Sequence, residues 1–220
     1  SYRTRLDRFL SAERGISRKD LRPILAQGRV TIDGMPATHM NQLVQQFTHI
    51  TLDEQVLRAE TPVYLMMNKP SGVVSATKDD KHKTVIDLLR HSDRQNLHIV
   101  GRLDYSSTGL ILLTNDGRWS RALTKPEHEV AKRYRVKLEN PVTREMVAAF
   151  EQGMHFPFEN ITTRPAKLTI ISQHIAEVSL VEGRYHQIKR MFGRYQNAVL
   201  ALHRIAIGGL LLDAALQPAQ

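Results

Sequence analysis

The stretch that decides the fold reads Gly101-Arg102-Leu103-Asp104-Tyr105-Ser106-Ser107-Thr108-Gly109-Leu110-Ile111-Leu112-Leu113-Thr114. Its second half is an unbroken apolar run closed by Asn-Asp-Gly, which is typical of a strand buried on both faces. Its first half is a polar loop between glycines, and loops at the edge of a rigid sheet are where catalytic groups collect. Asp104 is therefore a candidate functional residue. The alternative is that Asp104 makes only a local turn hydrogen bond.

The segments around this strand predict a mixture of strands and helices. Residues 132–138 alternate strictly, with Tyr134, Val136 and Leu138 on one face, as in a strand with one buried face. Because strands and helices follow one another in irregular order, the expected fold class is α+β. Further strands are expected at 63–67, 167–171 and 176–181, and helices at 85–89, 143–152 and 185–195.

The composition favours a partner that is a polyanion. The chain has 220 residues, of which 41% are hydrophobic, enough for a packed core. Its 31 Lys and Arg residues against 22 Asp and Glu give a net charge of +9, which makes nucleic acid the first partner to consider. The absence of cysteine excludes disulfides and thiol nucleophiles. No apolar run is long enough to span a membrane, so we expect a cytoplasmic protein without membrane contact.

The first sixty residues are polarised in charge. Residues 1–30 hold eight basic and three acidic residues, whereas residues 31–60 hold one basic and four acidic residues. Leu6, Phe9 and Leu10 have the spacing of a helical apolar stripe, and residues 21–25 repeat it. We therefore expect two short helices on a small sheet, with one basic face toward a phosphate backbone.

Three elements of this segment resemble the S4 RNA-binding modules over residues 3–58. They are Arg5-Leu6-Asp7-Arg8-Phe9-Leu10, then Ser17-Arg18, then Gly28-Arg29-Val30-Thr31-Ile32-Asp33-Gly34. The alternative is a generic small α/β domain whose arginines are merely solvated. Pro62 suggests the boundary, so we expect an S4-like domain over residues 1–60 and a second domain over residues 61–220. The RNA-binding candidates of the first domain are Arg5, Arg18, Lys19, Arg22 and Arg29.

Common catalytic motifs are missing from the rest of the chain. The sequence has no nucleotide-binding glycine motif, zinc-protease motif or serine-hydrolase elbow, and its ten histidines are too scattered to suggest a metal site. Ile188, Met191, Phe192 and Tyr195 form one helical stripe, and Lys189 falls at its edge. A half-buried cation there is tolerable mainly when a carboxylate pairs with it. The alternative is a core stripe with a solvated basic back.

Taken together, three segments resemble the pseudouridine synthases. They are Gly101-Arg102-Leu103-Asp104 with the Ser-Ser-Thr-Gly-Leu that follows, the strand around Tyr134, and Glu182-Gly183-Arg184-Tyr185-His186-Gln187-Ile188-Lys189-Arg190-Met191-Phe192. The resemblance implies that Asp104 is the catalytic aspartate, Tyr134 an active-site tyrosine and Lys189 the cation that pairs with the aspartate. It also implies a mixed, largely antiparallel catalytic sheet. The RNA-binding candidates are Arg102, Arg184, His186, Gln187 and Arg190.

The activity that this resemblance implies is the isomerisation of a specific uridine of ribosomal RNA, with small-subunit rRNA as the expected substrate. We expect no cofactor and no metal, a monomer, and rRNA or a ribosome assembly intermediate as partner. Asp104 would either attack C1′ or remove the C2′ proton, and a cation at Lys189 would keep it ionised. The extruded base would stack on an aromatic ring such as Tyr134.

Two departures from the family pattern leave the RNA target open. Ser106 stands where close relatives usually carry Asp, and the chain ends soon after Asp213 without the usual closing segment. One alternative is a synthase that acts on large-subunit rRNA. Another is a non-catalytic RNA-binding or ribosome-assembly factor, against which the intact set of Asp104, Tyr134 and Lys189 argues.

Overall fold

The structure is a computed structural model that describes residues 3–184 and 186–220. The chain divides into two compact units, residues 1–62 and 63–220, close to the boundary expected after residue 60. Each unit buries its own hydrophobic core. The two units are therefore described one at a time.

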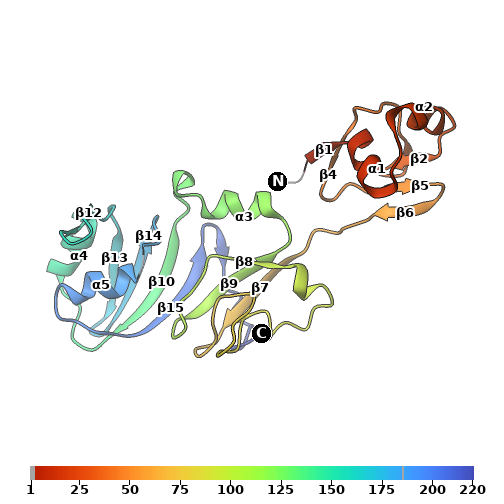
Figure 1. The fold of residues 1–220 in the computed structure, drawn as a ribbon. Coiled ribbons are helices and arrows are strands. Elements are labelled where there is room, and N and C mark those ends of the chain that lie inside the picture. The colour runs from red at the N-terminus through yellow and green to blue at the C-terminus, as the bar shows by residue number, and fades with distance from the viewer. Residues whose placement is uncertain (1–2, 185) are drawn as a thin grey trace. The chain divides into compact units, whose positions relative to one another are not determined.

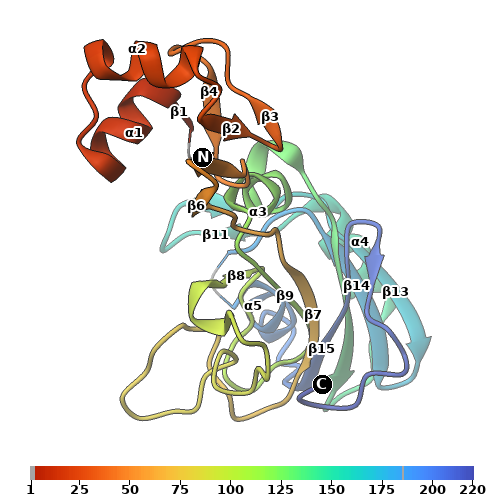
Figure 2. The ribbon, with the colours of Figure 1, turned by 90° about the vertical axis from the view of Figure 1, so that its right-hand side faces the viewer.

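The first unit packs two short helices against short strands (Figures 1 and 2). Ser17 caps the second helix, because its side chain accepts a hydrogen bond from the Asp20 amide. Leu6, Phe9, Leu10 and Leu21 are buried, as the helical spacing predicts. In the order of the chain the elements are β1 (Arg3–Arg5), α1 (Leu6–Arg14), α2 (Arg18–Ala26), β2 (Val30–Ile32), β3 (Met35–Pro36), β4 (Leu43–Gln45), β5 (Ile50–Leu52) and β6 (Gln55–Arg58). The strand order is β3-β2-β5-β6, and β1 pairs with β4.

The second unit is built on one large sheet whose strands run in the order β13-β14-β10-β15-β9-β7 (Figure 1). Within the described residues its pairings are antiparallel except β15 with β9. The expected mixed, largely antiparallel sheet is thereby confirmed. Its strands are β7 (Tyr64–Lys69), β8 (His98–Val100), β9 (Thr108–Thr114), β10 (Lys132–Leu138), β11 (His155–Phe156), β12 (Ile161–Thr162), β13 (Lys167–Ser172), β14 (Ile175–Leu180), β15 (Val199–Ile207) and β16 (Leu210–Leu211), of which β11 and β12 pair apart from the sheet. Its helices are η1 (Arg94–Asn96), α3 (Gly117–Thr124), η2 (Pro126–His128), α4 (Arg144–Gln152) and α5 (Gln187–Gly193).

The apolar run after the Asp104 loop forms β9, which pairs with β7, β8 and β15. Its residues 110–113 are buried on both faces of the sheet. Ile111 and Leu113 pack in one hydrophobic cluster, and Leu110 and Leu112 in another. The strand buried on both faces that the sequence predicts is confirmed, although β9 lies next to the end strand β7 and not at the centre of the sheet. It fixes the end of the loop that carries Asp104.

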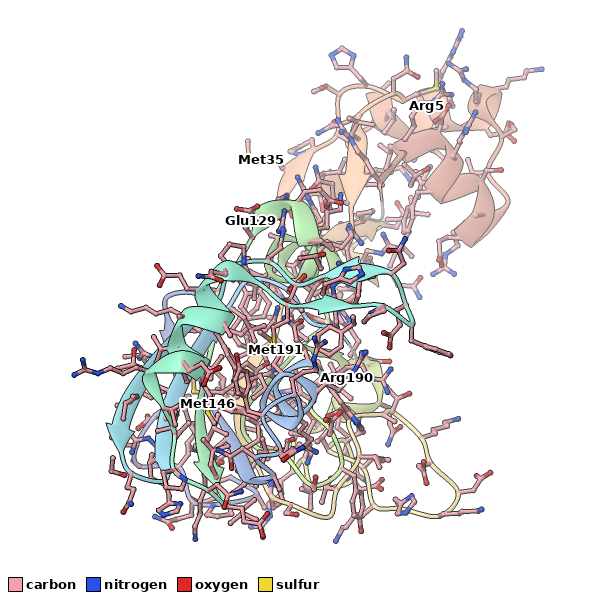
Figure 3. The ribbon with its side chains drawn as sticks, turned by 90° about the vertical axis from the view of Figure 1, so that its left-hand side faces the viewer. Arg5, Met35, Glu129, Met146, Arg190 and Met191 are labelled. Atoms are coloured by element: carbon pink, nitrogen blue, oxygen red, sulfur yellow. The ribbon has the colours of Figure 1, made fainter. Side chains whose placement is uncertain are left out.

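The alternation of β10 places Tyr134, Val136 and Leu138 in a core that α4 and α5 cover. Met146 of α4 and Met191 of α5 lie in this core (Figure 3). None of the helices in the described part of the chain is long and apolar enough to cross a membrane.

Two helix expectations need correction. Residues 85–89 form successive turns instead of a helix, with Leu88 N donating to Val85 O at 3.3 Å and Leu89 N to Ile86 O at 3.1 Å. Five residues with adjacent β-branched side chains give too few hydrogen bonds to nucleate a helix. The helix expected over 185–195 spans Gln187–Gly193, because His186 adopts a left-handed conformation with φ of 46°. Tyr185 lies outside the described residues.

Candidate active site

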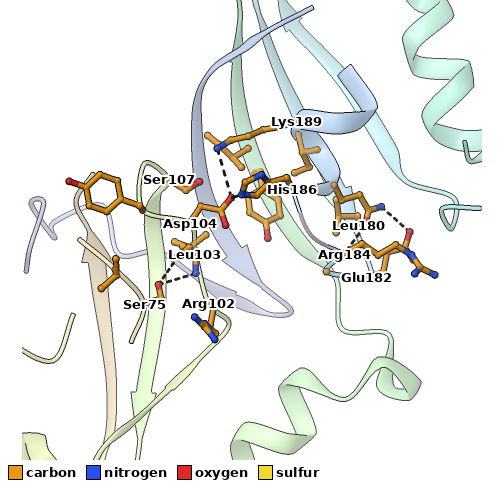
Figure 4. Close-up of a pocket in the computed structure, with 17 residues that line it drawn as sticks. Ser75, Arg102, Leu103, Asp104, Ser107, Leu180, Glu182, Arg184, His186 and Lys189 are labelled. Atoms are coloured by element: carbon orange, nitrogen blue, oxygen red, sulfur yellow. Dashed lines mark hydrogen bonds and ion pairs between the residues drawn. The ribbon is translucent and has the colours of Figure 1, made fainter. Parts of the chain in front are cut away.

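All but one of the expected site residues of the second unit line one cavity of about 640 Å³ (Figure 4). The loop before β9 supplies one wall, β10 the floor, and the segment leading into α5 the opposite wall. The expected residues that line it are Arg102, Asp104, Tyr134, Arg184, His186, Gln187 and Lys189. Arg190 of the expected set does not line this cavity. We call it the Asp104 cavity.

The loop that carries Asp104 is held by the protein around it. Ser75 Oγ donates to the Leu103 carbonyl at 2.8 Å and accepts from the Leu103 amide at 3.0 Å. Gly109 has φ of +108°, and a Cβ there would lie 2.2 Å from the Arg204 carbonyl oxygen, so only glycine fits. The turn bond weighed as an alternative is present, but it joins the Ser107 amide to the Asp104 backbone carbonyl at 3.1 Å. The Asp104 carboxylate is left to face the cavity.

Two nitrogen groups approach the Asp104 carboxylate from the opposite wall. The His186 Nε2 atom lies 3.3 Å and the Lys189 Nζ atom 3.8 Å from Oδ2 (Figure 4). The Lys189 ammonium also donates to Ser106 Oγ at 3.3 Å. The Asp104 side chain is 40% exposed, so solvent can reach it. The carboxylate therefore sits beside the Lys189 ammonium and the His186 ring while it remains open to the cavity.

Tyr134 lies at the bottom of the cavity on β10 and is only 9% exposed. Its ring is 5.9 Å from the Arg204 guanidinium carbon. Because β10 pairs with β14 and β15 on its two sides, the strand holds the ring in a fixed place. A rigid ring beside a carboxylate can stack on a planar base.

Sequence reasoning missed Lys69, which ends β7 and is completely buried. Its ammonium donates to the carbonyls of Pro70 at 2.9 Å, Tyr105 at 3.2 Å and Ser107 at 2.7 Å. Burial lowers the pKa of Lys69 to about 8, and the charge of Asp104 acts in the opposite direction. Lys69 therefore fixes the backbone just after Asp104. The available signal was strand parity, since Lys69 shares the face of the buried Met67.

A second residue that sequence reasoning missed is Arg204 of β15, which is 1% exposed. Its guanidinium donates to the carbonyls of Leu110 at 2.8 Å, Arg102 at 3.4 Å and Gly101. Burial lowers the pKa of Arg204. Arg204 thus holds the backbone before Asp104 and the start of β9, while Lys69 holds the backbone after it.

The wall opposite the loop is organised by Glu182. Its carboxylate accepts from the Gln187 amide group at 2.8 Å, Arg184 Nε at 3.1 Å and the Arg164 backbone amide at 2.7 Å. Gln187 is buried, so its amide shapes the turn that presents His186. Arg190 lies apart from the cavity, where it pairs with Glu159 and stacks on Phe156 at 4.6 Å.

The basic candidates of the first unit divide into two groups. Arg5 and Arg18 approach the buried Asp7 carboxylate at 2.6 and 3.3 Å, and Arg29 binds Asp53 through two hydrogen bonds. The hydrogen bond from Arg5 lowers the pKa of Asp7. Lys19 and Arg22 are exposed on α2. Within the described ranges, no group of three or more His, Asp or Glu side chains is placed to hold a metal ion.

Comparison with known proteins gives the class of this chain. Residues 63–193 match the family model described as RNA pseudouridylate synthase. The chain is similar to the Ribosomal small subunit pseudouridine synthase A of Pseudomonas aeruginosa, with 47% identity over 97% of this chain and 94% of the relative. It is also similar to the protein of the same name from Escherichia coli, with 39% identity over 98% of this chain and 94% of the relative.

A solved structure titled "Crystal structure of pseudouridylate synthase" matches over 99% of this chain and 94% of its own, with a TM-score of 0.71 and 36% identity. The mixed sheet and these matches define an isomerase that acts on RNA. The chain belongs to the RNA pseudouridylate synthase family.

Proposed function

We propose that this chain converts one uridine of small-subunit rRNA to pseudouridine, with Asp104 as the catalytic carboxylate. The observation that carries the proposal is the Asp104 carboxylate, which lies 3.8 Å from Lys189 and shares an open cavity with Tyr134. The names of the relatives from P. aeruginosa and E. coli support the small subunit as the source of the substrate.

The reaction requires no net oxidation and no external group. The N1–C1′ bond of uridine breaks, the uracil turns, C5 bonds to C1′, C5 loses a proton and N1 gains one. Asp104 either attacks C1′ or removes the C2′ proton, and both routes need its ionised form. Lys189 at 3.8 Å and His186 at 3.3 Å lie beside the carboxylate oxygen and can orient it toward the substrate.

The target nucleotide has to leave its stack, because its C1′ and C5 atoms are out of reach inside a helix. The ring of Tyr134 can stack on the extruded base. The side chain of the exposed Arg102 can fill the gap that the base leaves in the RNA stack. The first unit, whose exposed cations include Lys19 and Arg22, would hold the surrounding RNA. The partner would be rRNA or a ribosome assembly intermediate. A cytoplasmic location and a monomeric state remain predictions.

The test is to incubate the protein with unmodified small-subunit rRNA and, separately, large-subunit rRNA. Pseudouridine is then mapped by carbodiimide treatment and primer extension. We expect one new stop in the small-subunit RNA and none in the large-subunit RNA. A stop confined to the large-subunit RNA would show the alternative substrate. Tight binding with no stop in either RNA would favour the non-catalytic factor and overturn the proposal.

A further inference from the structure

A second cavity, of about 750 Å³, adjoins the Asp104 cavity. Arg102, Tyr134 and the segment 182–184 line both of them. From there the second cavity extends toward Lys125 at the end of α3 and Lys132 at the start of β10. The mechanism proposed above makes no use of this space. We call it the basic cavity.

The lining of the basic cavity is strongly positive. Among the described residues it has one acidic side chain, Glu182, whose carboxylate already accepts three hydrogen bonds from the protein. Arg164 pairs with Glu129 at 2.9 Å. The basic side chains of the lining are Arg102, Lys125, Lys132, Arg164, Arg184 and Arg204. The cavity therefore holds a surplus of positive charge that its own carboxylates do not neutralise.

Lys132 and Arg204 are the least exposed basic residues of the basic cavity. Lys132 is half-buried on the same face of β10 as Tyr134, and within the described chain its ammonium has no hydrogen bond or ion pair. Burial and the charge of Arg204 lower the pKa of Lys132. The N–H groups of Arg204 are directed to backbone carbonyls rather than to a carboxylate. Like charges held together in a concave, partly dehydrated site gain stability when an anion enters.

We infer that the basic cavity binds a phosphodiester group of the RNA strand next to the flipped uridine, with Lys132 as its main contact. The inference rests on the proposed function, because the substrate brings the anion. The two cavities meet at Arg102 and Tyr134, so a nucleotide in the Asp104 cavity places its own neighbouring phosphates at the entrance of the basic cavity. Lys125, exposed at the rim, would add a second contact.

The experiment uses short RNAs that contain the target uridine and one neutral methylphosphonate linkage, moved step by step along the strand. Their affinities are measured for the full chain, for Lys132→Gln and for Lys137→Gln. Lys137 is the matched control, since it is an exposed lysine of the same strand with the opposite parity. Lys132→Gln should weaken binding of unmodified RNA roughly tenfold and lower the salt slope by about 0.7 to 0.9. Lys137→Gln should change affinity much less.

The modified RNAs give the decisive result. For the unaltered protein, a methylphosphonate at one linkage beside the uridine should weaken binding roughly tenfold, and Lys132→Gln should bind that RNA no worse than unmodified RNA. Lys132→Gln and each methylphosphonate both cost binding free energy. If these two losses add at every linkage, the phosphate does not lie at Lys132. Equal affinities of Lys132→Gln and Lys137→Gln would also overturn the inference.

Two controls keep the outcome readable. Lys125→Gln, at an exposed position, should weaken RNA binding less than Lys132→Gln does. The methylphosphonate that removes its effect should lie at the same or an adjacent linkage. This variant remains informative if Lys132→Gln fails to fold. Competition by inorganic phosphate as strong as that by RNA would show a site for free anions and contradict the inference. Failure of the unaltered protein to form pseudouridine would count against the proposed function. The affinities for the methylphosphonate RNAs measure binding alone and test the further inference separately.

Discussion

The first unit and the Asp104 loop of the second unit use positive charge in opposite ways. In the first unit Arg29 pairs at the surface with the exposed Asp53, whereas Arg5 and Arg18 lie beside the buried Asp7 carboxylate. An exposed ion pair contributes little to stability, so a phosphate can replace Asp53 as the partner of Arg29 at little cost. In the second unit Lys69 and Arg204 are buried and bond to backbone carbonyls.

The difference teaches that the number of basic residues does not reveal what they do. A surface arginine with an exchangeable partner suits RNA docking. A buried cation held by carbonyls fixes a loop, because its loss would leave those carbonyls without a donor. We therefore expect substitutions in the first unit to change RNA affinity, and substitutions around the Asp104 cavity to change the rate of the reaction.

The largest effect is expected at the carboxylate itself. Asp104→Asn should lower the single-turnover rate of pseudouridine formation by at least about 10³-fold, because the amide is neither a nucleophile nor a base. RNA affinity should be kept or improved, since a negative charge facing phosphates is removed. The matched control is Asp93→Asn, an exposed aspartate without a side-chain cap bond that lines neither cavity. Near-normal turnover by Asp104→Asn would refute its catalytic role.

The next effect in size is expected at Lys69. Lys69→Met should lower the free energy of unfolding by about 2 kcal/mol, because three loop carbonyls lose their donor. A loop displaced by about 1 Å should also reduce the rate roughly 10²-fold with little change in RNA affinity. Urea denaturation and single-turnover assays measure the two effects, with Lys137→Met as control. A Lys69→Met protein with normal rate and stability would show that Lys69 does not hold the loop.

A smaller effect is expected at Lys189. Lys189→Met removes a cation 3.8 Å from Asp104 and should slow the reaction roughly tenfold. Lys189→Arg keeps the charge and should lose less. The single-turnover rate at one pH distinguishes the variants. An unchanged rate for Lys189→Met would mean that Lys189 is only a surface charge.

The smallest predicted effect concerns stability at alkaline pH. Because burial lowers the pKa of Lys69 to about 8, the folded chain loses this proton at lower pH than the unfolded chain does. Above pH 8 the unfolded state binds more protons at this position, so the contribution of Lys69 to stability rises with pH. From pH 8 to pH 9 the difference in unfolding free energy between the original protein and Lys69→Met should grow by up to about 1 kcal/mol. A difference that stays constant would contradict the lowered pKa.

Much of the second unit was predictable because its signals are local. The apolar run 110–113 and the alternation of 132–138 gave β9 and β10, and the same segments carried the resemblance that pointed to Asp104. Lys69 and Arg204 were not found, because their partners lie 38 and 94 residues away along the chain. Only the fold brings them to the Asp104 loop. The helix at 85–89 was wrong because short apolar spacing does not nucleate a helix.

The charge pattern of the first unit was likewise predictable only in part. The sequence indicated a basic segment, and Lys19 and Arg22 are exposed as a docking surface requires. The pairing of Arg29 with Asp53 joins residues 24 positions apart and depends on the pairing of β2 with β5. The RNA-binding roles of Arg5, Arg18 and Arg29 therefore stay predictions.

The central claim is that residues 63–220 hold the reaction centre and residues 1–62 supply RNA affinity. The most direct test is the single-turnover rate as a function of enzyme concentration, for the full chain and for residues 63–220 alone, which keep the hydrophobic clusters of the large sheet. We predict that the enzyme concentration at half-maximal rate is at least about tenfold higher for residues 63–220 than for the full chain. The maximal single-turnover rate of residues 63–220 should stay within about threefold of the rate of the full chain. Loss of the maximal rate in folded protein, or an unchanged concentration at half-maximal rate, would contradict the claim.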